Sequence, residues 1–76
     1  MDKIQVEQYV QDWITANWNA DKTDYHNTED LLELLHVRER RSRGKRDIEE
    51  ATILSALYER VQFMRELALG RIGEAV

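Results

Sequence analysis

The spacing of apolar residues near the start of the chain predicts an amphipathic helix over residues 3–18. Its large apolar side chains recur three and four positions apart, so they share one arc of a helical wheel, with polar residues opposite. They are Val6, Tyr9, Val10, Trp13 and Ile14. Residues 19–27 then hold one large apolar side chain among Asn, Asp and Thr residues, which hydrogen-bond to nearby backbone and favour a loop.

A second amphipathic stretch predicts a helix over residues 28–40. Asn27 or Thr28 suits its N-cap, and acids follow in its first turn, where they complement the helix dipole. Its apolar stripe consists of Leu31, Leu32, Leu34 and Leu35. Residues 38–47 then contain no apolar side chain. We therefore expect this stretch to stay outside the core and residues 38–46 to connect the second helix to the third, either as a solvated helix end or as a turn around Gly44.

The third predicted helix, residues 47–69, is the longest and has the widest apolar face. Asp47 with Glu50 resembles a capping box at its start, and Gly70 suits its C-terminal cap. The apolar arc is roughly 220° wide, against the ~100° of a typical surface helix. One neighbouring helix cannot cover such an arc. Either this helix is central and contacts both others, or part of its face meets a second chain.

These elements predict an all-α fold, a small three-helix bundle with a long, broadly apolar third helix that is also suited to dimerisation. The chain has 76 residues, no Pro, no Cys and three Gly, which predicts a single domain over residues 1–76, without disulfides or thiolate metal sites. Its start lacks the apolar core of a signal peptide, and no run reaches the ~18 apolar residues of a membrane span. We expect a soluble, cytoplasmic protein.

Charge is concentrated in residues 38–46 (RERRSRGKR). They hold six of the eleven Lys and Arg residues and one acid, a net charge of +5, whereas the remainder has 5 bases against 14 acids, or −9, within the total of −4. Such a cluster indicates an exposed surface that attracts anionic groups. The partner-binding residues predicted from it are Arg38, Arg40, Arg41, Arg43, Lys45 and Arg46.

Three interpretations of this basic segment stay open. The bases can complement the negative end of the second helix dipole and remain solvated. They can contact an acidic protein surface, or they can grip nucleic-acid phosphates. Against nucleic acid, the segment has no aromatic residues for base stacking, and the remainder of the chain repels phosphate. An acidic protein surface is therefore the favoured specific partner.

Two further residues are predicted to contact a partner. Trp18 lies at the end of the first helix, off its apolar stripe, and exposed Trp is enriched at binding hot spots; its alternative is to cover the end of the bundle. Arg60 projects into the apolar arc of the third helix. Its aliphatic side-chain stem can extend so that the guanidinium reaches solvent, or the guanidinium can pair with a carboxylate of a partner at an interface.

The sequence contains no motif that points to catalysis, a cofactor or a metal. Asp, Glu and His residues near the first loop match no EF-hand spacing, and no Ser lies in a nucleophile elbow. We therefore expect a small non-enzymatic regulator or inhibitor that binds a larger protein through helix surfaces and the Arg-rich segment. The alternatives are a nucleic-acid-associated accessory protein and a structural homodimer. A bacterial or bacteriophage origin suits a chain of this size and composition.

Overall fold

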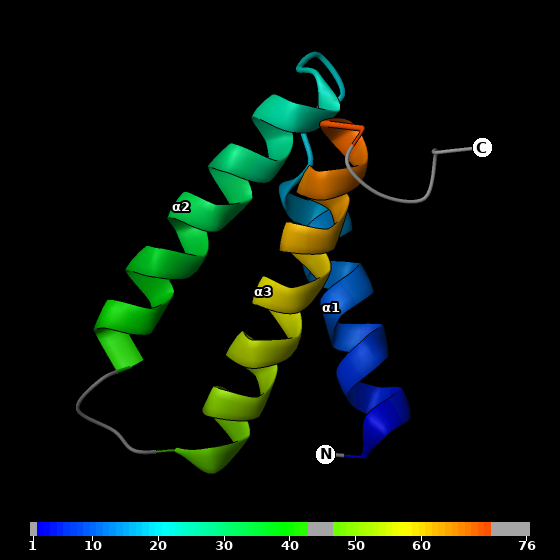
Figure 1. Cartoon of the computed structure of the whole chain (residues 1–76). Helices are drawn as coiled ribbons and strands as arrows, with labels where there is room; N and C mark the ends of the chain where they lie inside the picture. Colours follow the sequence, from blue (N-terminus) through cyan, green and yellow to red (C-terminus); the bar gives the residue numbers. More distant parts are fainter. Residues whose placement is uncertain (1, 43–46, 71–76) are drawn as a thin grey trace.

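The chain forms three helices, which confirms the predicted all-α class (Figure 1). The computed structural model describes residues 2–42 and 47–70, and within them the helices are α1 (Lys3–Asn17), α2 (Asp24–Ser42) and α3 (Ile48–Ala68). Helix α2 runs opposite to both α1 and α3. No strand occurs in the described part of the chain.

Helix α1 begins at a capping box that the sequence analysis missed. The Asp2 side chain accepts a hydrogen bond from the Gln5 backbone N–H at 2.9 Å, and the Asp2 backbone N–H donates to Gln5 Oε1 at 3.0 Å. Two backbone donors at the helix start are thereby satisfied, which sets the first residue of α1. The predicted span of residues 3–18 is confirmed to within one residue at its end.

Helix α2 begins four residues earlier than predicted, at Asp24. The Thr23 hydroxyl accepts from the His26 backbone N–H at 3.2 Å, as an N-cap does, so Asn27 and Thr28 lie inside the helix instead of capping it. Both side chains are fully buried. The helix continues through Ser42, so the first part of the basic segment is helical. Residues 43–46 lie outside the described residues, and with them the alternative of a turn around Gly44.

The buried Asn27 joins α2 to the loop of residues 18–23 that precedes it. Its Nδ2 donates to the Asn19 carbonyl at 2.8 Å and to the Thr23 carbonyl at 3.1 Å, and its Oδ1 accepts from the Asn19 backbone N–H at 2.8 Å. One side chain thus bonds to three backbone groups, of which the two carbonyls also accept from a backbone N–H and the Asn19 N–H depends on Asn27. This side chain is therefore the main polar contact that holds the α1–α2 connection.

Helix α3 begins at Ile48 with Asp47 as its N-cap, and the Asp47 Oδ1 accepts from the Glu49 backbone N–H at 2.9 Å. The predicted capping box with Glu50 is wrong, because the Glu50 carboxylate binds Arg38 instead. The helix ends at Ala68. Gly70 follows with a φ of 73°, the left-handed conformation that a glycine after a helix adopts.

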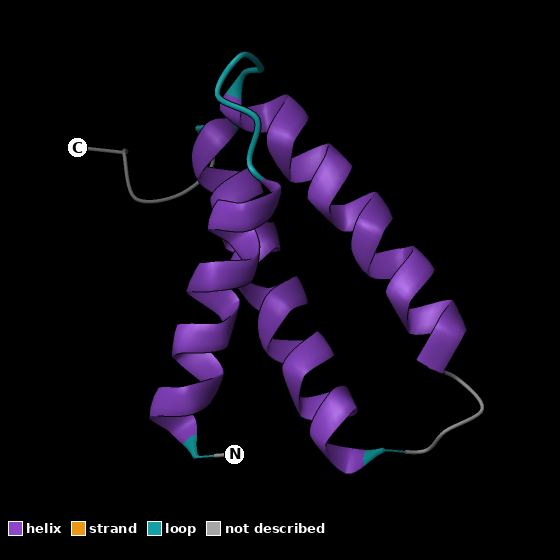
Figure 2. Cartoon of the chain, turned by 180° about the vertical axis from the view of Figure 1, so that it is seen from behind, coloured by secondary structure: helices purple, strands orange, loops and turns teal. Residues whose placement is uncertain are grey.

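Seven buried apolar residues contributed by all three helices form the core. They are Val10, Leu31, Leu35, Ile53, Leu54, Leu57 and Val61. Helix α3 packs against both α1 and α2, whereas α1 and α2 share few close backbone contacts. The prediction that the wide apolar face of α3 makes it the central helix is confirmed. Figure 2 shows α2 diverging from the other two helices with distance from the loop that joins it to α1.

Within residues 2–42 and 47–70, none of the helices has the length and apolar content needed to cross a lipid bilayer.

Candidate functional site

Arg38, the first base of the basic segment, is held between the helices. Its Nε donates to Glu50 Oε2 at 2.7 Å and its NH2 donates to Glu50 Oε1 at 3.0 Å, a bidentate pair between α2 and α3. Its guanidinium carbon also lies 5.4 Å from the centroid of the Tyr9 ring on α1. The expectation that the whole segment stays outside the helix packing is therefore wrong for Arg38, which connects all three helices.

The Arg38–Glu50 pair is largely shielded from water, with side chains 25% and 23% exposed. The hydrogen bonds that the Arg38 guanidinium donates to Glu50 raise its pKa above its already high ordinary value, against the opposing effect of burial. Arg38 thus stays charged at any physiological pH. The sequence predicted charged surface for the basic segment, but its first member acts as an interhelical contact.

Replacing Glu50 with Gln is expected to lower the free energy of unfolding by about 1–2 kcal/mol, because a half-buried Arg38 loses its counterion but keeps a hydrogen-bond partner. Urea denaturation followed by circular dichroism measures the change. Glu49→Gln is the matched control, since Glu49 is an exposed acid in the same turn and its loss costs about 0.5 kcal/mol or less. Equal effects of the two substitutions would contradict a structural role for the pair.

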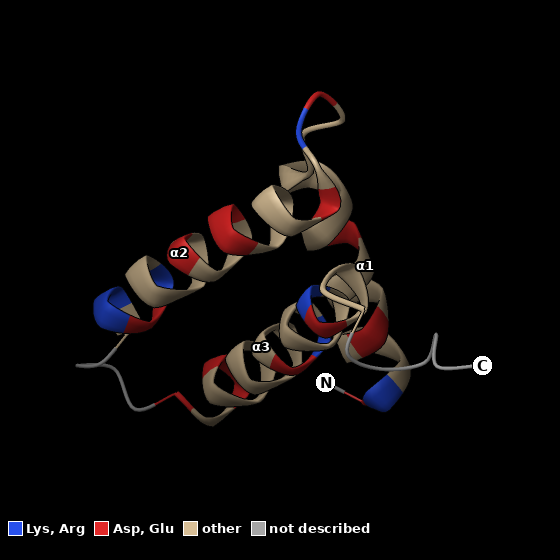
Figure 3. Ribbon diagram, turned by 45° about the horizontal axis from the view of Figure 1, so that its top comes forward, with Lys and Arg blue, Asp and Glu red and all other residues tan. Residues whose placement is uncertain are grey.

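The next two bases of the segment remain on the surface. Arg40 and Arg41 are exposed in the last turn of α2, and neither forms a salt bridge or hydrogen bond within the described part of the chain. Arg43, Lys45 and Arg46 lie outside the described residues. Figure 3 shows Lys and Arg gathered at this end of α2, whereas Asp and Glu recur along all three helices. The positive surface is therefore local.

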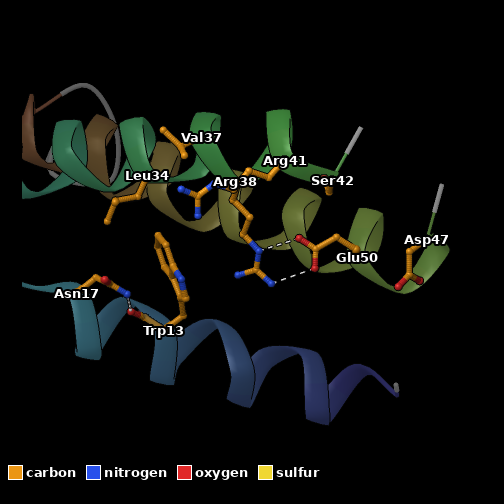
Figure 4. Close-up of a pocket in the computed structure, with 9 residues that line it drawn as sticks. All are labelled: Trp13, Asn17, Leu34, Val37, Arg38, Arg41, Ser42, Asp47 and Glu50. Atoms are coloured by element: carbon orange, nitrogen blue, oxygen red, sulfur yellow. Dashed lines mark hydrogen bonds and ion pairs between the residues drawn. The ribbon is translucent and has the colours of Figure 1, made fainter. Parts of the chain in front are cut away.

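A groove of about 480 Å³ opens between α1 and α2 beside this basic end, and we call it the inter-helix groove. It is lined by Trp13, Asn17, Leu34, Val37, Arg38, Arg41, Ser42, Asp47 and Glu50. Figure 4 shows the Trp13 ring rising from α1 toward α2, with Leu34 and the Arg38–Glu50 pair around it. Leu34 is 44% exposed, so the groove presents apolar surface to solvent near Arg41, which forms no ion pair with any residue that the structure describes.

The two remaining predicted contacts lie apart from this region. Trp18 is partly buried against the core at the C-cap of α1, which is the bundle-covering position named as its alternative. Arg60 is exposed on α3 and lines a second groove, of about 450 Å³, between α1 and α3 with Phe63, which is 52% exposed. The structure thus brings Arg41 and Trp13 together but separates Trp18 and Arg60 from the basic end.

Two polar contacts across helices were not foreseen from the sequence. The Tyr58 hydroxyl donates to Glu39 Oε1 at 3.1 Å and lies 3.2 Å from His36 Nδ1, and burial followed by the Glu39 bond raises the pKa of Tyr58. The Arg65 NH2 donates to the Tyr25 hydroxyl at 3.0 Å. Each joins α2 to α3 over residues distant in sequence, a relation that spacing along one helix cannot indicate.

A comparison of the chain with models of known protein families, with curated protein sequences and with solved structures finds no match to any of them. In the described ranges, no group of three or more His, Cys, Asp or Glu side chains is arranged to hold a metal ion. Function is therefore inferred from the residues and geometry of this chain alone.

Proposed function

We propose that this chain is a small non-enzymatic regulatory protein that binds a larger protein with an acidic surface through the C-terminal end of α2. The observation that carries the proposal is the pair of exposed cations, Arg40 and Arg41, at a helix end that also borders apolar surface. Arginine guanidinium groups form bidentate bonds with carboxylates, and arginine is enriched at protein interfaces.

The local nature of the positive charge supports a protein partner over nucleic acid. The remainder of the chain carries −9, and exposed acids recur along the helices. At physiological ionic strength charges interact over about 8 Å, so Arg40 and Arg41 attract a carboxylate that docks beside them. An extended phosphate backbone is longer than this range, so the acidic residues around the basic end also repel it. Arginine can nevertheless bind phosphates, so nucleic acid stays the second candidate.

Reversing the charge at Arg40 and Arg41 together is expected to weaken binding to the partner at least tenfold, because two attractive contacts become repulsive. The partner is first captured with the tagged chain from cells of its source at moderate salt, then produced separately and titrated by calorimetry. The double variant Arg40→Glu, Arg41→Glu should keep its helical circular dichroism, since both side chains are exposed.

Lys3→Glu is the matched control, a charge reversal at an exposed base on another helix, in the first turn of α1. It is expected to change the affinity less than twofold. Recovery of nucleic acid in place of a protein, with binding that falls steeply as salt rises, would replace the proposal by its second candidate. A captured protein that binds both variants as tightly as the unaltered chain would refute the role of α2.

A further inference from the structure

The inter-helix groove has the shape of a binding site for one more helix. Its walls are two antiparallel helices that hardly touch, while α3 contacts both of them from one side. Along α2 the groove is lined at positions 34, 37, 38 and 41, and along α1 at positions 13 and 17. Spacings of three, four and seven residues mark the stripe by which one helix faces another. Each wall thus presents a helix-packing stripe that the described elements cover only in part, since Arg38 is bound by Glu50 of α3 and Leu34 is 44% exposed.

The chemistry of the walls favours a helical occupant. Before the last turn of each helix the backbone N–H and C=O groups along both walls are paired within their own helices, so the groove offers no free strand edge for an extended peptide to join. An occupant must therefore satisfy its own backbone, as a helix does. Its contacts with Trp13, Leu34 and Val37 are apolar, and Trp13 supplies the large, half-buried aromatic surface typical of a binding hot spot.

The charged residues of the groove determine which kind of helix it can bind. Of the ionic groups in the groove, Arg38 and Glu50 bind each other and Asp47 caps α3, which leaves Arg41 as the charge without an ion pair in the described part of the chain. A carboxylate placed beside Arg41 would form a charge-assisted bond at the groove rim, whereas an ammonium group would be repelled.

We infer that the inter-helix groove binds an amphipathic, acidic helix of the partner, with apolar residues on Trp13, Leu34 and Val37 and an Asp or Glu on Arg41. The inference rests on the proposed function and deepens it, since it names the element of the partner that is recognised. The helix occupies the open side between α1 and α2 and turns the three-helix arrangement into four helices.

A displayed library of helices tests the inference without knowledge of the natural partner. Each member is ~18 residues long, about five turns, with Leu or Ala at the helix-facing positions and Glu, Gln or Lys at the flanking positions. Selection for binding to the unaltered chain is expected to enrich Glu at a flanking position. Selection for binding to the Arg41→Glu variant is expected to enrich Lys at that same position.

Recovered helices are then titrated against point variants. Leu34→Glu, at a side chain that is 44% exposed, and Arg41→Glu should each weaken binding about tenfold or more. Arg40→Glu is the matched control and should change affinity less than threefold, because Arg40 does not line the groove. Binding should also shift the indole N–H resonance of Trp13. Circular dichroism confirms that each variant folds.

Absence of binders, enrichment without a charge preference, or binders unaffected by Leu34→Glu would overturn the inference. These failures are distinct from a failure of the proposed function. A cellular partner that depends on Arg40 and Arg41, with no acidic helix selected, would leave the basic end as the binding site and remove the groove. Selected helices together with a cellular partner that depends on Arg41 but is indifferent to Arg40 would keep the groove as the binding site and remove the exposed end of α2, because Arg41 lines the groove and Arg40 does not.

Discussion

Replacing Leu57 with Ala is expected to lower the free energy of unfolding by about 2–5 kcal/mol, the range for deleting a buried Leu side chain and leaving part of its volume empty. Leu57 has no exposed surface and belongs to a core that comprises seven buried apolar residues within residues 2–42 and 47–70. A domain of this size has a correspondingly small stability. Each kcal/mol shifts the midpoint of thermal unfolding by about 4–8 °C, so a loss of about 3 kcal/mol lowers it by about 12–24 °C.

Thermal and urea unfolding monitored by circular dichroism measure this effect. The control is Ile48→Ala on the same helix, at a side chain that is 83% exposed, with an expected change within about 0.5 kcal/mol. Similar losses for the two substitutions would contradict the placement of α3, because its buried and exposed faces would then contribute alike.

The second large effect is expected for Asn27→Ala, about 2–3 kcal/mol. Removal of the carboxamide leaves the Asn19 N–H without its partner and the Asn19 C=O with only the Lys22 N–H, and an unsatisfied polar group shielded from water costs about 1–3 kcal/mol. The loop of residues 18–23 should loosen as well. Amide hydrogen exchange at Asn19 is expected to accelerate by more than the global stability loss accounts for.

Asn17→Ala provides the matched control. Asn17 also donates from its carboxamide, to the Trp13 carbonyl at 2.8 Å, but its side chain is exposed and the freed carbonyl remains paired or reaches water. Its loss should cost about 0.5 kcal/mol or less. If Asn17→Ala and Asn27→Ala cost the same, the buried network does not hold the connection between α1 and α2.

The periodicity of apolar residues was sufficient to predict the class, the number of helices and the central place of α3. The width of the α3 apolar arc carried that last prediction, because two neighbours are needed to cover it. The prediction was wrong at the start of α2, where Asn27 was assigned to a cap. A polar residue near a helix start suggests a cap from sequence alone, but its burial depends on where the preceding loop returns in space.

The fate of the basic segment was predictable only in part. Charge density predicted that the segment avoids the core, and among its described residues Arg40 and Arg41 are exposed. The pairing of Arg38 with Glu50, twelve residues away, depends on how α2 and α3 cross. The inter-helix groove was likewise missed, since it arises from the divergence of α1 and α2 and leaves no mark in either helix alone.

The central claim is that the basic end of α2 meets a larger protein, and photo-crosslinking from single positions tests it most directly. A benzophenone side chain is placed at Arg40 in one variant and at Phe63 in another, and each is irradiated in cells of the source. We expect a covalent adduct with a larger protein from position 40 and none from position 63. Adducts only from position 63, or from position 40 to nucleic acid or to a second copy of the chain, would contradict the claim.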